Sequence, residues 1–285
     1  MRQYQKALER HLADYKRRRL GVQQSGEFKR KNTVVSHPHI LPKDLNLLNM
    51  LEPFRDEFRL FRASHGIKLH KDFHHLNSSQ ALAFNLFLPF FRDGTKACER
   101  LFRALGVPGT VDDWRFEHVV DKSERTTVDV SWHDPDAGWT LCEVKLSERE
   151  FGAAKADARH RRKLDRIYAP RLRTQVDERF LQFDAFIAHY QLLRNVSLLM
   201  RPGVARLVFL LPQQNEGPQV ALREVLDAIA PHLRARIHVS YLENVLARLA
   251  GDSGLGGVLR EHARQLTEKY VLAAAGRSIA PGRDT

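Results

Sequence analysis

Residues 127–145 read TVDVSWHDPDAGWTLCEVK, a stretch that predicts two β-strands joined by a turn. Runs rich in β-branched and aromatic residues, at 127–132 and 139–145, flank the loop HDPDAG (133–138), whose Asp, Pro and Gly favour a turn. An antiparallel hairpin centred near Asp136 pairs residues whose numbers sum to 272. The expected pairs are Val128 with Val144, Val130 with Cys142, and Trp132 with Thr140. One face of the hairpin is therefore expected to be apolar.

The same register sets Asp129 directly opposite Glu143, with Lys145 one diagonal step away. Like charges in such a cross-strand pair destabilise a sheet, so a cation between the two carboxylates is the expected compensation. Mg²⁺ fits, because it takes one or two carboxylates together with water and substrate phosphate. The backbone carbonyl of Val144 is a candidate further ligand. Glu117, on the preceding strand, is a candidate third carboxylate.

These residue types suit the hydrolysis of a phosphodiester. A bound cation offsets the negative charge of the phosphate and lowers the pKa of a water. Lys145 can then donate to the attacking water or to the charge that grows on the phosphoryl oxygens. An Asp followed later by Glu-x-Lys is also common by chance, and the alternative is a solvated hairpin face with a weak surface ion pair.

The whole chain is strongly basic, which suits a polyanionic partner. Its 285 residues carry a formal net charge of +12, and 43% of them are hydrophobic, enough for a substantial core. Nucleic acid is the leading partner class. Cys98 and Cys142 form neither a disulfide framework nor a metal-binding pair. The N-terminus lacks the apolar run of a signal peptide, and no run reaches membrane-span length, so we expect a soluble cytoplasmic protein.

The order of elements along the chain predicts an α/β fold. Helices are expected at 2–19, 44–64, 78–91, 94–105, 151–166, 176–200, 217–230, 242–250 and 255–274. Strands are expected at 114–120, 127–132, 139–145, 205–211 and 236–241. An antiparallel meander followed by helix–strand units indicates a sheet covered by helices on both faces.

At this point the sequence resembles a known superfamily. The order Glu117, Asp129, Glu143-Val144-Lys145 is similar to that of the PD-(D/E)XK nucleases, which share a restriction-endonuclease-like fold. The segments LNSSQALAFNLFLPF (76–90) and YQLLRN (190–195) resemble those of a bacterial family of restriction endonucleases within that superfamily. Val128 stands where proline gives the motif its name, a frequent variation.

The resemblance implies a fold, a division of the chain and a function. The fold is α/β: a restriction-endonuclease-like core with a central mixed β-sheet flanked by helices, and an N-terminal helical extension. We expect residues 1–93 to form a helical region packed on the core, 94–250 the nuclease core, and 251–285 a C-terminal helix and tail. The implied activity is metal-dependent hydrolysis of DNA by an endonuclease of restriction or defence type.

The resemblance also implies residue roles. Asp129 and Glu143 would ligate Mg²⁺, for which Mn²⁺ is expected to substitute, and Lys145 would assist the attack. Gln191 matches a helix glutamine near the active site in related nucleases, and Glu117 matches the acidic position on the first core strand less closely. Gln80 and Asn85 are expected to make buried hydrogen bonds that support the sheet.

Basic residues near these positions are candidates for binding DNA phosphates. They are Arg159, Arg161, Arg162 and Lys163, on the helix after the Glu143 strand, and Arg194, close to Gln191. A charge run of this kind is more often a solvated helix face.

Several alternatives stay open at this stage. The chain could be a non-catalytic nucleic-acid-binding module that retains the nuclease fold, or a nuclease acting on RNA or branched DNA. A double-strand cut would favour a homodimer. His70 and His74, four residues apart with His75 adjacent, could be zinc ligands, but ordinary partly buried histidines are favoured. Glu99 is more simply a surface residue than an extra acidic ligand.

Overall fold

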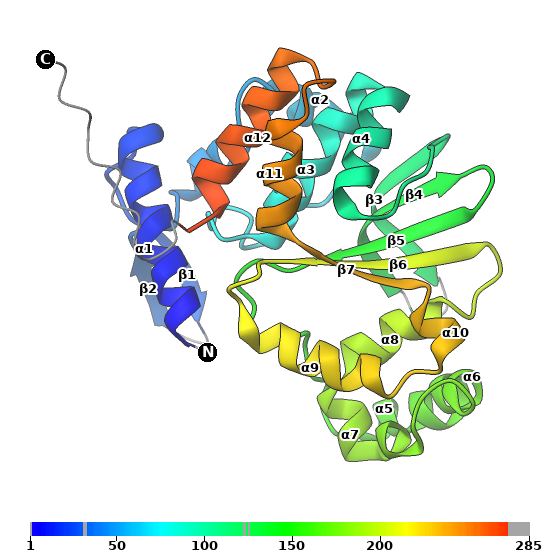
Figure 1. Cartoon of the computed structure of the whole chain (residues 1–285). Helices are drawn as coiled ribbons and strands as arrows, with labels where there is room; N and C mark the ends of the chain where they lie inside the picture. Colours follow the sequence, from blue (N-terminus) through cyan, green and yellow to red (C-terminus); the bar gives the residue numbers. More distant parts are fainter. Residues whose placement is uncertain (1, 31–32, 122–123, 125, 273–285) are drawn as a thin grey trace, which may run out of the picture.

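A five-stranded mixed sheet lies at the centre of the computed structural model, which describes residues 2–30, 33–121, 124 and 126–272. The strands, in their order across the sheet, are β3 (Asp113–Asp121), β4 (Thr126–Asp134), β5 (Gly138–Val144), β6 (Val204–Leu211) and β7 (Ile237–Tyr241) (Figure 1). β3, β4 and β5 pair antiparallel, whereas β5 with β6 and β6 with β7 pair parallel. The predicted α/β fold with a mixed sheet is confirmed.

Helices cover both faces of this sheet (Figure 1). On one side lie α2 (Arg55–His65), α3 (Ser79–Asp93), α4 (Thr95–Leu105), α11 (Leu242–Gly251) and α12 (Gly257–Tyr270). On the other side lie α5 (Ala158–Lys163), α6 (Ala169–Leu172), α7 (Phe183–Ala188), α8 (Tyr190–Leu198), α9 (Glu216–Asp227) and α10 (Pro231–Arg234). The predicted N-terminal helix is α1 (Arg2–Arg19), and it lies beside a separate hairpin of β1 (Gly26–Arg30) and β2 (Thr33–His37).

Helix α3 is the centre of the first helical layer. Its residues from Gln80 to Phe91 are all buried, as expected for a helix that is apolar on every side. Ser78 caps the helix, because its side chain accepts a hydrogen bond from the backbone N–H of Ala81. The sequence expectation of a capped core helix over 78–91 is therefore confirmed.

The alternation of side chains along β5 separates two apolar clusters, one on each face of the sheet. Cys142 and Val144 pack with α3, α4, α11 and α12, whereas Leu141 packs in the cluster that contains Phe209 and the helices of the other layer. Glu143 lies between Cys142 and Val144 in the strand, so its side chain is directed towards the second layer. That direction decides which helix meets it.

The register of the β4–β5 hairpin is confirmed over most of its length and is wrong at one end. Val130 pairs with Cys142 and Trp132 with Thr140, as expected. The ladder stops at the first of these pairs, so the expected pairing of Val128 with Val144 is not formed. Val128 instead packs in the cluster of the opposite face. The alternation of β4 therefore reverses at Asp129.

Several helix expectations were too long. The expected helix 44–64 is a 3₁₀ turn (Lys43–Asn49) and α2, separated by a segment that contains Pro53, which lacks a backbone N–H. The expected helix 151–166 begins only at Ala158, where the Asp157 side chain caps it by accepting from the His160 N–H. Its later part is a π-helical turn (Leu164–Tyr168).

The expected helix 176–200 is a 3₁₀ turn (Glu178–Leu181) followed by α7 and α8, and His189 breaks it with non-helical φ and ψ of −109° and 21°. The β1–β2 hairpin was missed. The expected helix 255–274 ends at Tyr270, and residues 273–285 of the proposed C-terminal region lie outside the described residues.

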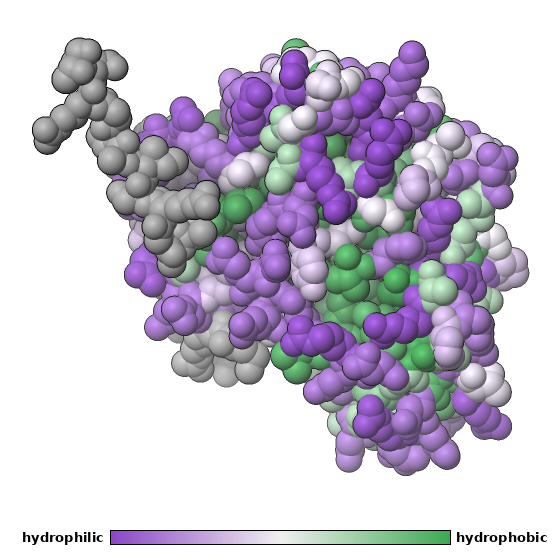
Figure 2. All heavy atoms as spheres, in the orientation of Figure 1, coloured by the Kyte–Doolittle hydropathy of each residue, from purple (hydrophilic) through white to green (hydrophobic). Residues whose placement is uncertain are grey.

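Hydrophilic side chains cover most of the face seen in Figure 2, and apolar ones gather where the edge strand β7 lies over α9. Within the described part of the chain, no helix combines the length and the apolar content needed to cross a membrane.

Trp132 is the side chain on which we test this packing. Its ring is 1% exposed and stacks on Phe102 of α4, with ring centroids 4.5 Å apart. Trp132→Ala should lower the free energy of unfolding by about 3–5 kcal/mol, because it removes a large buried ring and leaves a cavity. Leu60→Ala, at a side chain that is 67% exposed, should change it by less than about 0.5 kcal/mol. Equal effects in urea titrations would contradict this packing.

Candidate active site

The site begins where β4 and β5 separate, just beyond the Val130–Cys142 pair. There a carboxylate oxygen of Asp129, Oδ2, accepts a hydrogen bond of 2.7 Å from the backbone N–H of Val144. A side chain of one strand thus replaces a ladder bond to the next. The predicted cross-strand pair of Asp129 with Glu143 is not formed, because the ladder ends one residue earlier. Asp129 instead reaches β5 through its side-chain bond to Val144.

Glu143 and Lys145 form a buried ion pair directed towards α8. Their side chains are 5% and 9% exposed, and Lys145 Nζ lies 2.8 Å from Glu143 Oε1. Burial acts to lower the pKa of Lys145, but Glu143, Glu148 and Asp129 outweigh it, so this pKa is raised. Lys145 is therefore held as a cation.

Helix α8 completes the network with two amide side chains. Gln191 donates to Glu143 Oε1 at 2.6 Å and accepts from Lys145 Nζ at 3.2 Å. Asn195 donates to Glu143 Oε2 at 3.1 Å and is fully buried. Gln191 was predicted to lie near the site, whereas Asn195 was missed. The sequence feature that could have pointed to Asn195 is its position four residues after Gln191, on the same face of the helix.

Gly152, in the loop before α5, lies against Gln191. Its carbonyl accepts from the Gln191 backbone N–H at 3.2 Å. A Cβ at Gly152 would stand 2.9 Å from Gln191 Oε1, and its φ of +108° is one that other residues rarely adopt. The absence of a side chain at this position leaves room for the amide that contacts Lys145.

Glu117 lies on β3, in a backbone conformation that is unusual for a non-glycine residue. Its φ is +49°, and strain of this kind costs about 1–3 kcal/mol and is concentrated at functional sites. Gln80 of α3 donates to Glu117 Oε1 at 2.8 Å, which confirms its expected support of the sheet. The ring of His70 lies 3.8 Å from Glu117 Oε2, and the Glu117 carboxylate raises the pKa of His70. His70 was not among the sequence-based candidates for this site.

The two carboxylates keep oxygen lone pairs that no hydrogen bond from the described residues uses. Asp129 has a raised pKa, chiefly because of burial and then because of repulsion by Glu143, with Lys145 acting in the opposite direction. No donor in the described part of the chain contacts Asp129 Oδ1. Glu143 Oε2 accepts only one hydrogen bond from those residues, which leaves it one lone pair. Both atoms are hard oxygen ligands of the kind that Mg²⁺ prefers.

The described residues contain no group of three or more His, Cys, Asp and Glu side chains arranged to hold a metal. Glu117 is therefore not gathered with Asp129 and Glu143 as a third carboxylate. A cation here would rest on two carboxylates, a backbone carbonyl such as that of Val144, water and phosphate, a set that suits Mg²⁺.

The zinc hypothesis for His70, His74 and His75 gains no support: His74 is buried and contacts the Glu27 carbonyl. Glu99 lies on α4.

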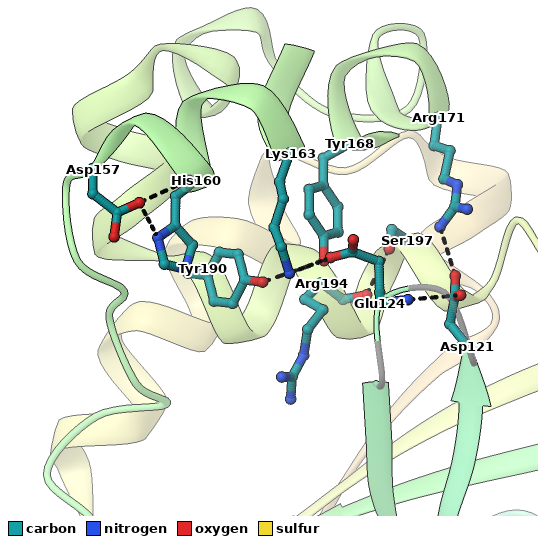
Figure 3. Close-up of polar contacts among 10 residues, drawn as sticks. All are labelled: Asp121, Glu124, Asp157, His160, Lys163, Tyr168, Arg171, Tyr190, Arg194 and Ser197. Atoms are coloured by element: carbon teal, nitrogen blue, oxygen red, sulfur yellow. Dashed lines mark hydrogen bonds and ion pairs between the residues drawn. The ribbon is translucent and has the colours of Figure 1, made fainter. Parts of the chain in front are cut away.

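The basic residues predicted to bind phosphate lie in different environments, and Figure 3 draws Lys163 and Arg194. Arg159 and Arg162 are exposed on α5, and Arg161 stacks on Phe183 at 3.8 Å. Lys163 points inwards and lies 2.6 Å from Glu124 at the β3–β4 turn. Lys163 is therefore an internal ion pair, and Arg159 and Arg162 are the residues best placed for an external partner.

Arg194 follows Gln191 by one helical turn and faces Tyr190, with its guanidinium 6.0 Å from the ring centroid. Figure 3 shows this guanidinium pointing away from the Glu124–Lys163 pair. On the far side of that pair, Asp121 is held by Arg171 and Arg201 at 3.2 and 2.8 Å. These contacts hold the end of β3 and Glu124 against the helical layer that contains α5.

The comparisons with known proteins identify one family. A family model described as Restriction Endonuclease associating with ARP matches residues 9–271, which is most of the chain. No curated protein matches, and no solved structure matches.

Asp129 gives a prediction that does not depend on any activity. A raised pKa in the folded state means that ionised Asp129 destabilises the fold once the pH exceeds that pKa. In metal-free buffer, Asp129→Asn should therefore raise the free energy of unfolding at neutral pH, by about 1 kcal/mol. The gain should shrink as the pH falls towards the ordinary carboxyl pKa of 3.8, below which both states of the parent become protonated. Denaturant titrations from pH 4 to pH 8 measure it, and a gain that is constant with pH would refute this assignment.

Proposed function

Because the chain belongs to the restriction endonuclease family described as Restriction Endonuclease associating with ARP, we propose that it is a metal-dependent deoxyribonuclease that cuts DNA internally. The observation that supports this most is the Lys145 ammonium, held by Glu143 and Gln191 beside a second carboxylate, Asp129. A role in defence against foreign DNA fits this activity and would place the protein in the cytoplasm with its substrate.

In this proposal Asp129 and Glu143 hold Mg²⁺, or Mn²⁺ in its place, with the Val144 carbonyl as a further ligand. The cation would offset the charge of the phosphate and lower the pKa of a bound water. Lys145 donates hydrogen bonds to that water or to the phosphoryl oxygens as their charge grows. Glu117 is not gathered with the two ligands, but its negative charge reaches the site, since its carboxylate also acts to raise the Asp129 pKa.

The two amides of α8 orient the ligand carboxylate. Gln191 and Asn195 bond different oxygens of Glu143, so the carboxylate cannot rotate freely. Gln191 also accepts from Lys145, which keeps the ammonium close to the carboxylates. Such supporting contacts fix the direction of ligands and of proton donors.

Cleavage of plasmid, linear, methylated and single-stranded DNA tests this proposal. Asp129→Asn or Lys145→Ala should lower the rate of Mg²⁺-dependent cutting by about 10²-fold or more, because each removes a group that acts at the reacting phosphate. EDTA should stop the parent enzyme and Mg²⁺ should restore it. Asp136→Asn, at an exposed residue of the same hairpin, is the matched control and should cut like the parent.

Parental rates in both site variants would show that the assignment is wrong. Tight DNA binding with no cutting under any metal condition would favour the alternative, a binding module that keeps the fold. Preferential cutting of RNA or branched DNA would keep the site and change the substrate. Products cut in both strands at once would indicate that two copies act together.

The exposed arginines of α5 give a separate prediction. The double variant Arg159→Ala/Arg162→Ala should weaken DNA binding and reduce the slope of log affinity against log salt by about 2, because two phosphate contacts are lost. The matched control is Arg59→Ala/Arg264→Ala, at side chains that are 64% and 58% exposed on α2 and α12. Fluorescence anisotropy over a salt series measures both slopes. Equal slopes in the two double variants would show that α5 is not part of the DNA-binding surface.

A further inference from the structure

The loop that follows Lys145 determines what surrounds its ammonium group. Among the described residues, the last backbone hydrogen bond of this chain segment to the sheet is the bond of 2.8 Å from the Lys145 N–H to the Leu210 carbonyl. The chain then turns away, and the backbone N–H of Leu146 donates to Glu148 Oε2 at 2.7 Å. Glu148 is one of the three carboxylates that raise the pKa of Lys145. The shape of this loop therefore sets the position of a charge next to the lysine.

Asn215, in the segment between β6 and α9, is hydrogen-bonded to this loop. Its side chain is buried, and the residue is 1% exposed. Its amide Nδ2 donates to the Glu148 carbonyl at 2.8 Å and to the Leu146 carbonyl at 3.3 Å. One amide group thus ties two carbonyls on either side of Ser147. The geometry of a buried loop is set by bonds of this kind, because an unpaired buried carbonyl is costly.

A second close contact keeps the two segments together. Gly217, at the start of α9, lies so near the loop that a Cβ there would stand 2.2 Å from the Arg149 carbonyl oxygen. Only glycine fits at this distance. Together, Asn215 and Gly217 lock the beginning of α9 against the residues that follow Lys145.

The oxygen of the Asn215 amide is hydrogen-bonded to the N-terminal helix. Asn215 Oδ1 accepts a hydrogen bond of 3.2 Å from Nε2 of Gln5, on α1. Gln5 is itself buried, and it is 210 positions away from Asn215 in sequence. A chain of bonds therefore runs from α1 through one amide to the loop beside Lys145.

We propose that Asn215 is a positioning residue for Lys145, and that α1 acts on the candidate site through Gln5. Asn215 touches no reacting atom in this account. It fixes the carbonyls of Leu146 and Glu148, and so the direction in which Lys145 leaves the sheet. The consequence for catalysis rests on the proposed nuclease function, whereas the effect on the loop does not.

Gln219 provides a matched control. Its side chain donates to the carbonyls of Pro212, Gln213 and Asn215, so it supports the same segment between β6 and α9. Among the described residues, it makes no bond to 146–152. Gln219→Met should therefore lower the melting temperature while kcat stays within about twofold of the parent.

The test measures kcat and KM for Mg²⁺-dependent cutting of the DNA that the parent cuts best. Asn215→Leu should lower kcat by about 10- to 10²-fold, with KM within about twofold, because small displacements at a reacting centre have effects of this size. Asn215→Asp keeps the acceptor for Gln5 and loses the donor, and it should show the same loss if Asn215→Leu fails to fold. Gln5→Met should lower kcat less, and should add nothing when combined with Asn215→Leu.

Hydrogen exchange of the segment 145–152, in the full-length protein, provides a readout without substrate. It should be faster in Asn215→Leu than in the parent and unchanged in Gln219→Met. A parental kcat in both Asn215 variants, or equal acceleration of exchange in Gln219→Met, would overturn the proposal. If the parent cuts no nucleic acid, the proposed function fails, and the exchange result alone then decides whether Asn215 holds the loop.

Discussion

Two carboxylates, Asp129 and Glu143, lie together at the edge of an apolar core with a single ammonium group, Lys145, to balance them. Buried charge is costly unless it is paired, and here two negative charges face one positive charge. The pKa of Asp129 is raised chiefly by burial and then by the repulsion of Glu143. We propose that a further cation offsets this charge, and this constraint connects the other features of the structure.

The elements around the cluster serve to hold it in place. The sheet provides two of its groups at the point where β4 and β5 separate, and α8 supplies the amides of Gln191 and Asn195. The strained backbone of Glu117 is supported by Gln80 from the N-terminal helical region. That region therefore contributes directly to the site instead of only covering the sheet. The proposed link from Gln5 through Asn215 extends the same principle to α1.

The local patterns of the sequence predicted the sheet and the candidate cluster well. Alternating residues on both sides of HDPDAG gave the register of Val130 with Cys142, and the resemblance to restriction endonucleases led to Gln191. The reversal of alternation at Asp129 could not be read from the pattern, because it depends on a side chain that replaces a ladder bond. Gln80 was expected to support the sheet, but Glu117 was not predicted as its partner. The contacts of His70 and Asn215 were not predicted either, because they join segments that are distant in sequence. Lys163 reads as a surface cation in sequence and is an internal ion pair, since Glu124 lies on a different element.

The central claim is that Asp129 and Glu143 form a cation site, and calorimetric titration of the metal-free protein with Mn²⁺ tests it most directly. The parent should bind Mn²⁺ in competition with Mg²⁺, Asp129→Asn should lose this binding, and Asp136→Asn should bind as the parent does. The same heat in Asp129→Asn as in the parent, or no heat in the parent, would contradict it.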